Sequence, residues 1–134
     1  MSERPEVGKA KFDWIAQRAG CTVPRVFITL RAEVEEDVKS RNALRPEGAT
    51  YEFSVVDKGN SFAVALQTAD FYREVSFVLE DPVILVLDPS GNQLFDISVT
   101  FTSMGKCTLK AKEEACEPWQ VRRMALEDLL FRLV

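Results

Sequence analysis

The chain has 134 residues, of which 46% are hydrophobic and 28% charged, and its net charge is -4. This length and composition are typical of one globular domain that needs neither a metal ion nor a disulfide. We expect the domain to span residues 1–134, with a flexible tail at residues 1–8. The negative charge argues against nucleic acid and membranes as partners, because both favour a basic surface.

Histidine is absent from the sequence. Its absence excludes the Ser-His and Cys-His nucleophile pairs, imidazole metal ligands and the most common general base near neutral pH. We therefore assign no catalytic residue, no metal site and no cofactor. A non-enzymatic protein is expected, with an enzyme kept as an alternative.

The cysteines are Cys21, Cys107 and Cys116, an odd number with no C-x-x-C spacing. They predict free, mostly buried thiols in a reducing cytoplasm rather than a disulfide framework or a zinc knuckle. The first ten residues lack the apolar run of a signal peptide. The longest apolar run has five residues, whereas a membrane span needs roughly 20. The sequence therefore predicts a cytoplasmic protein.

Two helices are expected before the first strand. In residues 9–20 apolar side chains recur at helical spacing, and Gly20 is a common C-terminal stop. Residues 21–48 carry a second apolar stripe, with Thr22 as its N-cap and Pro46 beyond its end.

The second helix contains an acidic run, EVEEDVK, at residues 33–39. We interpret the run as a solvated helix face rather than a metal site. Glu35 with Lys39 and Asp37 with Arg41 have the i, i+4 spacing of ordinary ion pairs on an exposed helix.

From residue 50 the hydrophobic pattern changes to strict alternation, which predicts about six short strands. Short connections imply an antiparallel meander that helices must cover. The fold class is therefore α+β, with two N-terminal helices, the meander sheet and a C-terminal helix packed on the sheet. This order resembles the helix-grip folds, in which a curved antiparallel sheet wraps a C-terminal helix, although their first strand is missing here. The resemblance implies a fold and no activity.

Two aspartates, Asp81 and Asp88, flank the apolar run at residues 83–87. A strand between them would hold them roughly 23 Å apart, whereas a catalytic carboxylate pair needs about 5 to 10 Å. We interpret both as turn residues, since the segment DPSG that begins at Asp88 fits a type I turn.

The same turn predicts how the two strands beside it pair. Continuing from the turn, Leu85 faces Phe95 on the core side, and Ile84 faces Asp96 on the outer side. This register places Ile84 and Val86 on an apolar outer face beside a carboxylate. Asp96, Ile84 and Val86 are therefore candidate contacts for a ligand or a partner.

The C-terminal helix has one broad apolar arc that includes Trp119 and Leu133, and Arg122 falls inside it. Arg122 either snorkels to water or points a fixed cation into a sheet–helix cavity. In the cavity it would need a carboxylate or an anionic ligand. Met124 and Phe131 lie off the arc and indicate a second contact, with other helices or another subunit.

Three functions remain open from the sequence. The preferred one is a non-enzymatic interaction module that self-associates or binds another protein, because no catalytic constellation is recognised. The alternative is a small-molecule-binding domain with a sheet–helix pocket anchored by Arg122. The third is a carboxylate-based enzyme that would draw on Asp96, Tyr51 and Tyr72.

Overall fold

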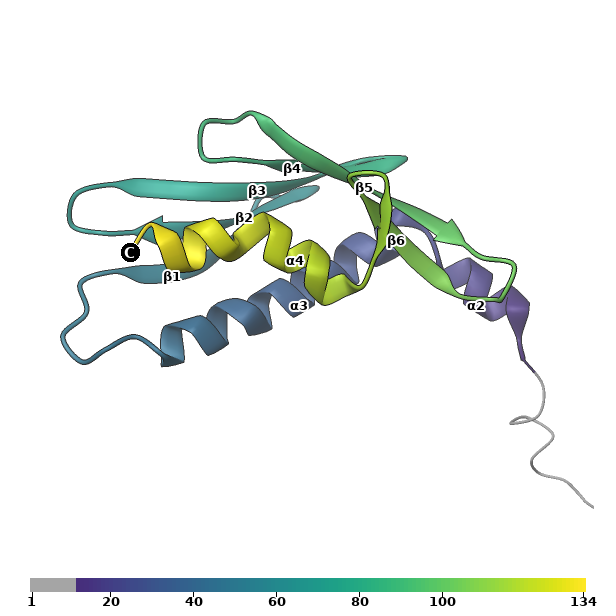
Figure 1. Ribbon diagram of the computed structural model, residues 1–134, viewed down its shortest axis with the longest axis horizontal. Coiled ribbons are helices and arrows are strands. Elements are labelled where there is room, and N and C mark those ends of the chain that lie inside the picture. Colours follow the sequence, from purple (N-terminus) through teal and green to yellow (C-terminus); the bar gives the residue numbers. More distant parts are fainter. Residues whose placement is uncertain (1–11) are drawn as a thin grey trace, which may run out of the picture.

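The computed structural model describes residues 12–134, so the expected tail at residues 1–8 lies outside the described residues. Helices α2 and α3 precede a seven-stranded antiparallel sheet, and α4 follows it. The α+β prediction is confirmed. Helices α3 and α4 lie side by side on the same face of the sheet (Figure 1). The helical segments are α2 (Trp14–Gly20), α3 (Val23–Ala43), α4 (Pro118–Glu127) and a π-helical turn, η1 (Asp128–Arg132).

Each strand of the sheet pairs with its neighbours in the chain, in the order β1 to β7. The structure has seven strands where the sequence predicts about six. The last strand is not predicted because the turn before β7 contains no glycine or asparagine. Instead Lys112 and Glu113 adopt φ values of 52° and 67°, which a two-residue hairpin of this kind needs. The strands are β1 (Glu52–Asp57), β2 (Ser61–Gln67), β3 (Tyr72–Glu80), β4 (Val83–Leu87), β5 (Gln93–Phe101), β6 (Cys107–Ala111) and β7 (Glu114–Cys116).

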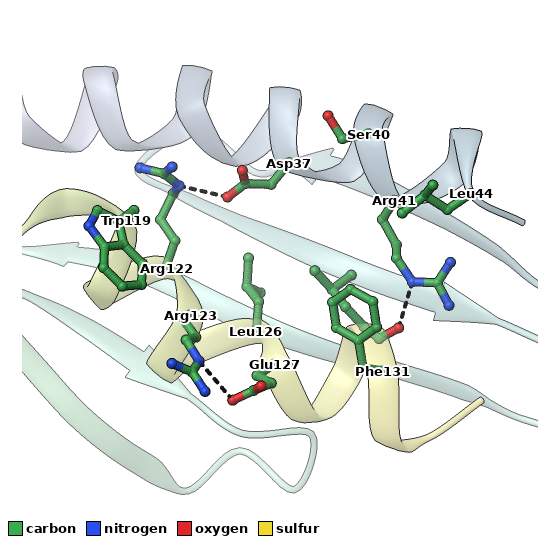
Figure 2. A pocket seen from close by; sticks show the side chains of 11 residues that line it. Asp37, Ser40, Arg41, Leu44, Trp119, Arg122, Arg123, Leu126, Glu127 and Phe131 are labelled. Carbon is green, nitrogen blue, oxygen red and sulfur yellow. Dashed lines mark hydrogen bonds and ion pairs between the residues drawn. The ribbon is translucent and has the colours of Figure 1, made fainter.

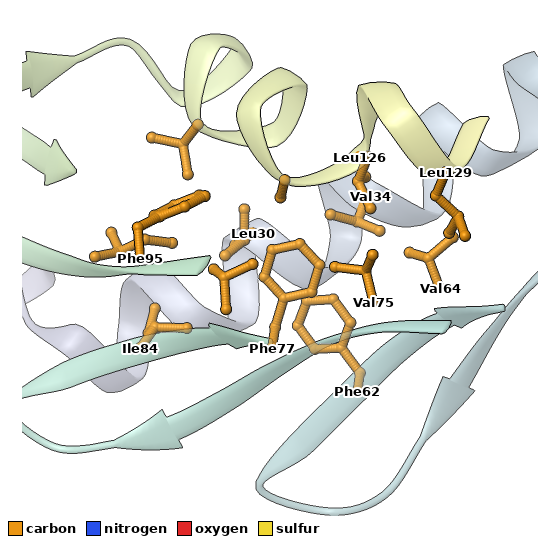
Figure 3. Close-up of a cluster of buried hydrophobic side chains, with 14 of the residues drawn as sticks. Leu30, Val34, Phe62, Val64, Val75, Phe77, Ile84, Phe95, Leu126 and Leu129 are labelled. Atoms are coloured by element: carbon orange, nitrogen blue, oxygen red, sulfur yellow. The ribbon is translucent and has the colours of Figure 1, made fainter. Parts of the chain in front are cut away.

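The core fills the space between the two long helices and the inner face of the sheet. Phe62 and Phe77 stack with their ring centroids 4.8 Å apart, and Phe27 of α3 lies 5.2 Å from Phe62. Leu126 and Leu129 reach the same cluster from the C-terminal helix (Figure 3). Burying each such side chain contributes about 1.5 to 3 kcal/mol to folding, so this cluster fixes α3 and the C-terminal helix on the sheet.

The turn at Asp88 has the hydrogen bonds that its sequence predicts. The Asp88 carboxylate accepts from the amides of Ser90 and Asn92 at 2.9 Å, and the Asp88 amide donates to the Asn92 carbonyl at 2.8 Å. Gly91 completes the turn at φ 86°, a conformation that glycine adopts without steric cost. Asp88 is therefore a turn residue.

The strand register beyond this turn differs from the prediction. Leu87 pairs with Gln93, as expected, but Val86 then pairs with Phe95. Leu94 is an extra residue in β5, so the pair contains a β-bulge. A bulge of one residue exchanges the two faces of everything that follows it, which is why the predicted faces of β4 are reversed.

The observed register places two of the candidate contact residues in the core. Ile84 and Val86 have no exposed surface, and Ile84 pairs with Ile97 on the inner face. The prediction that they lie on the outer face was wrong. Leu85 takes that place, half-buried, and its pairing partner across the strands is the exposed Asp96.

The prediction of free thiols was wrong for two of the cysteines. Cys21 and Cys107, which are 86 positions apart in the sequence, form a disulfide with their Cα atoms 5.4 Å apart. Cys116 is free and half-buried. The bond fastens the joint between α2 and α3 to the start of β6, and it removes the basis for assuming a reducing compartment.

Within the described residues no helix is both long and apolar enough to cross a membrane.

Candidate binding groove between α3 and α4

A groove runs between α3 and α4, which lie along each other in the same direction. Arg122 of α4 contacts Asp37 of α3, and further along both helices Leu130 contacts Arg41. The groove between these contacts has a volume of about 400 Å³ (Figure 2). It is lined by Asp37, Ser40, Arg41, Leu44, Trp119, Arg122, Arg123, Leu126, Glu127, Leu130 and Phe131.

Helical spacing explains why charged residues line this groove. On α3, Glu33, Asp37 and Arg41 recur every four residues, so they form one row on the side that faces α4. The facing row on the C-terminal helix begins with Arg122 and continues with Leu126 and Leu130. Ion pairs therefore hold one end of the groove, and a hydrogen bond from Arg41 together with apolar packing holds the other.

The structure resolves the two alternatives for Arg122. Its Nε donates to Asp37 Oδ2 at 2.6 Å and its Nη1 to Glu33 Oε1 at 3.1 Å, and only 17% of its side chain is exposed. Arg122 thus enters a protein cavity, and carboxylates of the same chain meet it there. The expected pair of Asp37 with Arg41 is not formed, because Asp37 turns towards α4 instead.

Sequence reasoning missed Arg41, the most deeply buried charged residue of the described chain, with 9% of it exposed. Its Nε donates to the Leu130 carbonyl at 2.8 Å, and its Nη2 lies 3.4 Å from the Tyr51 hydroxyl. The Arg41 guanidinium carbon also lies 4.9 Å from the ring centroid of Phe131 and 5.2 Å from that of Phe53. Within residues 12–134 no carboxylate comes within 4.0 Å of it.

Two helix ends stabilise the Arg41 charge without a counter-ion. α3 ends at Ala43, two residues beyond Arg41, and η1 ends at Arg132, two residues beyond the Leu130 carbonyl. The C-terminal end of a helix carries a partial negative charge, which favours a nearby cation. The aromatic rings add cation–π attraction. The sequence did carry a signal for Arg41, because it continues the apolar stripe of α3 beyond Val38.

Large apolar side chains stand exposed along the rim of the groove. Trp119 is 53% exposed, Phe131 57% and Leu44 69%. Met124 and Phe131 lie off the packed face of the helix, as predicted. Trp119 does not pack in the core as expected, because the buried face centres on Val121, Ala125 and Leu129 instead.

The residues considered for a carboxylate enzyme are not brought together. Asp96 lies on the outer sheet face, in a row with Leu85 and Val78, whereas Tyr51 contacts Arg41 on the inner side. Tyr72 is six residues along β3 from Val78, a distance of about 20 Å along the strand. The three residues therefore do not form a common site.

Tyr72 belongs instead to a small polar network with Glu74. Burial raises the pKa of the Tyr72 hydroxyl, and its hydrogen bond to Glu74 at 3.0 Å adds to the increase. The hydrogen bond from Lys58 to Glu74, also 3.0 Å long, lowers the pKa of that carboxyl. The shifted pKa values of Tyr72 and Glu74 are therefore explained by their burial and hydrogen bonds on the outer sheet face.

Comparison with protein-family models, curated proteins and solved structures finds no match for the chain.

Proposed function

We propose that the protein is a non-enzymatic interaction domain that binds an amphipathic helix of a partner protein in the groove between α3 and α4. One observation carries the proposal: aromatic and aliphatic side chains stand exposed along a groove that also contains arginines. Trp119 and Phe131 are more than half exposed, Arg122 and Arg123 lie between them on the C-terminal helix, and Arg41 lies against Phe131. Aromatic residues, methionine and arginine are the residues enriched at protein interfaces and at their energetic hot spots.

The dimensions of the groove suit a helix. Trp119 and Phe131 are twelve residues apart on the C-terminal helix, which corresponds to about 18 Å. A partner helix would cover this length with about three turns and present apolar anchors at i, i+4 and i+7. Met124 extends the same apolar surface to the other side of α4.

A selection from a library of helical peptides tests this proposal. Peptides selected on the wild-type protein should bind the Trp119→Ala variant about 30-fold more weakly, because removing a hot-spot tryptophan costs about 2 kcal/mol or more. Met104→Ala is the matched control, since Met104 is an exposed apolar residue in the turn between β5 and β6. Equal binding to the wild type and to Trp119→Ala would refute the proposal.

The same two proteins, the wild type and Trp119→Ala, also distinguish self-association from the binding of a different protein. Sedimentation velocity of the wild type and of Trp119→Ala shows whether a second copy occupies the groove. A dimer that disappears in Trp119→Ala identifies a second copy as the partner, and a dimer that persists in Trp119→Ala lies elsewhere. The Cys21–Cys107 disulfide favours an oxidising compartment for these encounters over the cytoplasm that the sequence predicts.

A small-molecule site is the second candidate function. It is favoured by the groove volume of about 400 Å³, which falls within the usual range for ligand pockets. Its anchor would be Arg41 and not Arg122, whose charge Glu33 and Asp37 already meet. Two fluorescent probes test it: 8-anilinonaphthalene-1-sulfonate, and N-phenyl-1-naphthylamine, which lacks the sulfonate. This function predicts tighter binding of the sulfonate, and a loss of that preference in Arg41→Gln.

A further inference from the structure

We infer that the helix bound in the groove carries an aspartate or glutamate whose carboxylate contacts Arg41. This inference rests on the proposed function and specifies the chemistry of the partner. It starts from the unequal distribution of carboxylates among the three arginines that line the groove. Arg122 has two carboxylates and Arg123 has Glu127 at 3.1 Å, whereas Arg41 has none among the described residues.

The hydrogen bonds of Arg41 leave part of its guanidinium available. Nε is fully used by the Leu130 carbonyl at 2.8 Å, and Nη2 makes a long contact of 3.4 Å with Tyr51. Nη1 donates to no residue in the described range. Arginine has five N–H donors, so the two Nη atoms present a planar edge that a carboxylate matches with paired hydrogen bonds.

The surroundings of Arg41 favour such a contact. A guanidinium in a weakly hydrated site interacts more strongly with an anion than it would in water. Arg41 is 9% exposed, and the side chain above it is Phe131, whose ring is largely at the surface. Phe131 can therefore change rotamer to admit a carboxylate without disturbing the core. Charge complementarity thus specifies an acidic residue at this end of the groove.

The position of Arg41 also sets where the acid lies in the partner. Trp119 marks one end of the groove, and Leu130, which Arg41 contacts, is eleven residues further along the helix, or about 17 Å. A partner helix lying along the groove spans the same distance with about eleven residues. The expected pattern is an apolar anchor at Trp119 and an Asp or Glu about eleven positions away.

The peptide selection is repeated with Arg41→Gln beside the wild type. Peptides from the wild-type selection should share an acidic residue at one position, and those from Arg41→Gln should not. A selected peptide and its Glu→Gln counterpart are then compared by fluorescence anisotropy. On the wild type the glutamate peptide should bind about tenfold more tightly, as a charge-assisted hydrogen bond implies. On Arg41→Gln the two peptides should bind within about twofold of each other.

Arg31→Gln is the matched control, because Arg31 lies on the same helix as Arg41, does not line the groove and is already paired with Asp57. It should keep the preference for glutamate. The peptide pair on the wild-type protein needs no variant, so the test holds even if Arg41→Gln fails to fold. Selected peptides without an acidic preference, or equal binding of the pair, would overturn this inference and leave the groove proposal intact. Peptides that bind Trp119→Ala as well as the wild type would overturn both.

Discussion

The two ends of the α3–α4 pair are held in different ways. At the N-terminal end, a disulfide fastens Cys21 to Cys107, and about three turns further along α3 the Arg122 guanidinium is shared by the carboxylates of Glu33 and Asp37. At the C-terminal end, Arg41 has a backbone carbonyl and aromatic rings for partners and no carboxylate among the described residues. Both ends contain a largely buried arginine, but only the first meets it with opposite charge.

This difference shows which arginine already has its counter-charges within the protein and which one can still accept a contact from a partner. A guanidinium with two carboxylates gains little from a further anion. A guanidinium held by helix ends and aromatic rings is stable in the free protein and still has donors to offer. The exposed side chains of Leu44 and Phe131 gather at the same end. The acidic contact of a partner is therefore expected at the C-terminal end, and stability is expected to depend most on the N-terminal end.

The largest effect on stability is expected from removing the disulfide. Replacing Cys21 and Cys107 together with serine should lower the free energy of unfolding by about 4 kcal/mol, because the bond closes a long loop in the unfolded chain. Urea denaturation of the oxidised wild type and of the double variant measures this change. Cys116→Ser, at the free and half-buried cysteine, is the control. A loss below about 1 kcal/mol would show that the N-terminal end is not held by this bond.

The next largest effect is expected at the other end. Arg41→Ala should destabilise the protein by about 2 to 3 kcal/mol, because it leaves the buried Leu130 carbonyl without its donor and removes the packing against three aromatic rings. Ser40→Ala, at an exposed neighbour that lines the same groove, should change stability by less than about 0.5 kcal/mol. Equal thermal unfolding of Arg41→Ala and the wild type would mean that Arg41 does not hold η1 in place.

A smaller effect with a different salt dependence is expected at Arg122. Arg122→Ala should cost about 1 to 2 kcal/mol, since it leaves Glu33 and Asp37 without their shared cation on partly exposed side chains. The cost of Arg122→Ala should shrink as salt increases, whereas that of Arg41→Ala should not, because salt screens ion pairs and leaves packing unchanged. Unfolding at low and high salt separates the two. The same salt dependence at both positions would remove the distinction between the two ends.

The smallest effect concerns Glu74, which lies on the outer sheet face away from both ends. Its folded-state pKa is lowered from 4.5, so its charged form stabilises the folded state. That contribution is present above the unfolded pKa and is lost as pH falls through the folded pKa. It should amount to less than about 1 kcal/mol and should be absent in Glu74→Gln. Urea midpoints measured from neutral to acidic pH test this, and identical profiles for both proteins would contradict it.

Local sequence signals predicted the order of elements and the Asp88 turn, because both depend on neighbouring residues. The bulge at Leu94 and the Cys21–Cys107 bond were not predictable in this way. The bulge changes the register by one residue, with no glycine to mark it, and the disulfide joins positions 86 residues apart.

Local sequence signals also predicted only part of the candidate site, as the two arginines show. The sequence indicates Arg122 because it interrupts an apolar arc, but its partners on α3 depend on how the two helices pack together. Arg41 continues the apolar stripe of α3, but its sequence pattern is that of an ordinary charged residue on an exposed helix. Its role follows from the end of η1 lying against it, a contact between residues 89 positions apart in the sequence.

The most direct test of the binding site is to map amide chemical shifts in the isotope-labelled domain while a selected helical peptide is added. Binding in the groove predicts the largest shifts at residues 40–44 and 119–131, with little change on the outer sheet face. The largest shifts at residues 83–87 and 94–98 would instead place the partner on the outer sheet face around Leu85 and Asp96, and would contradict the proposed site.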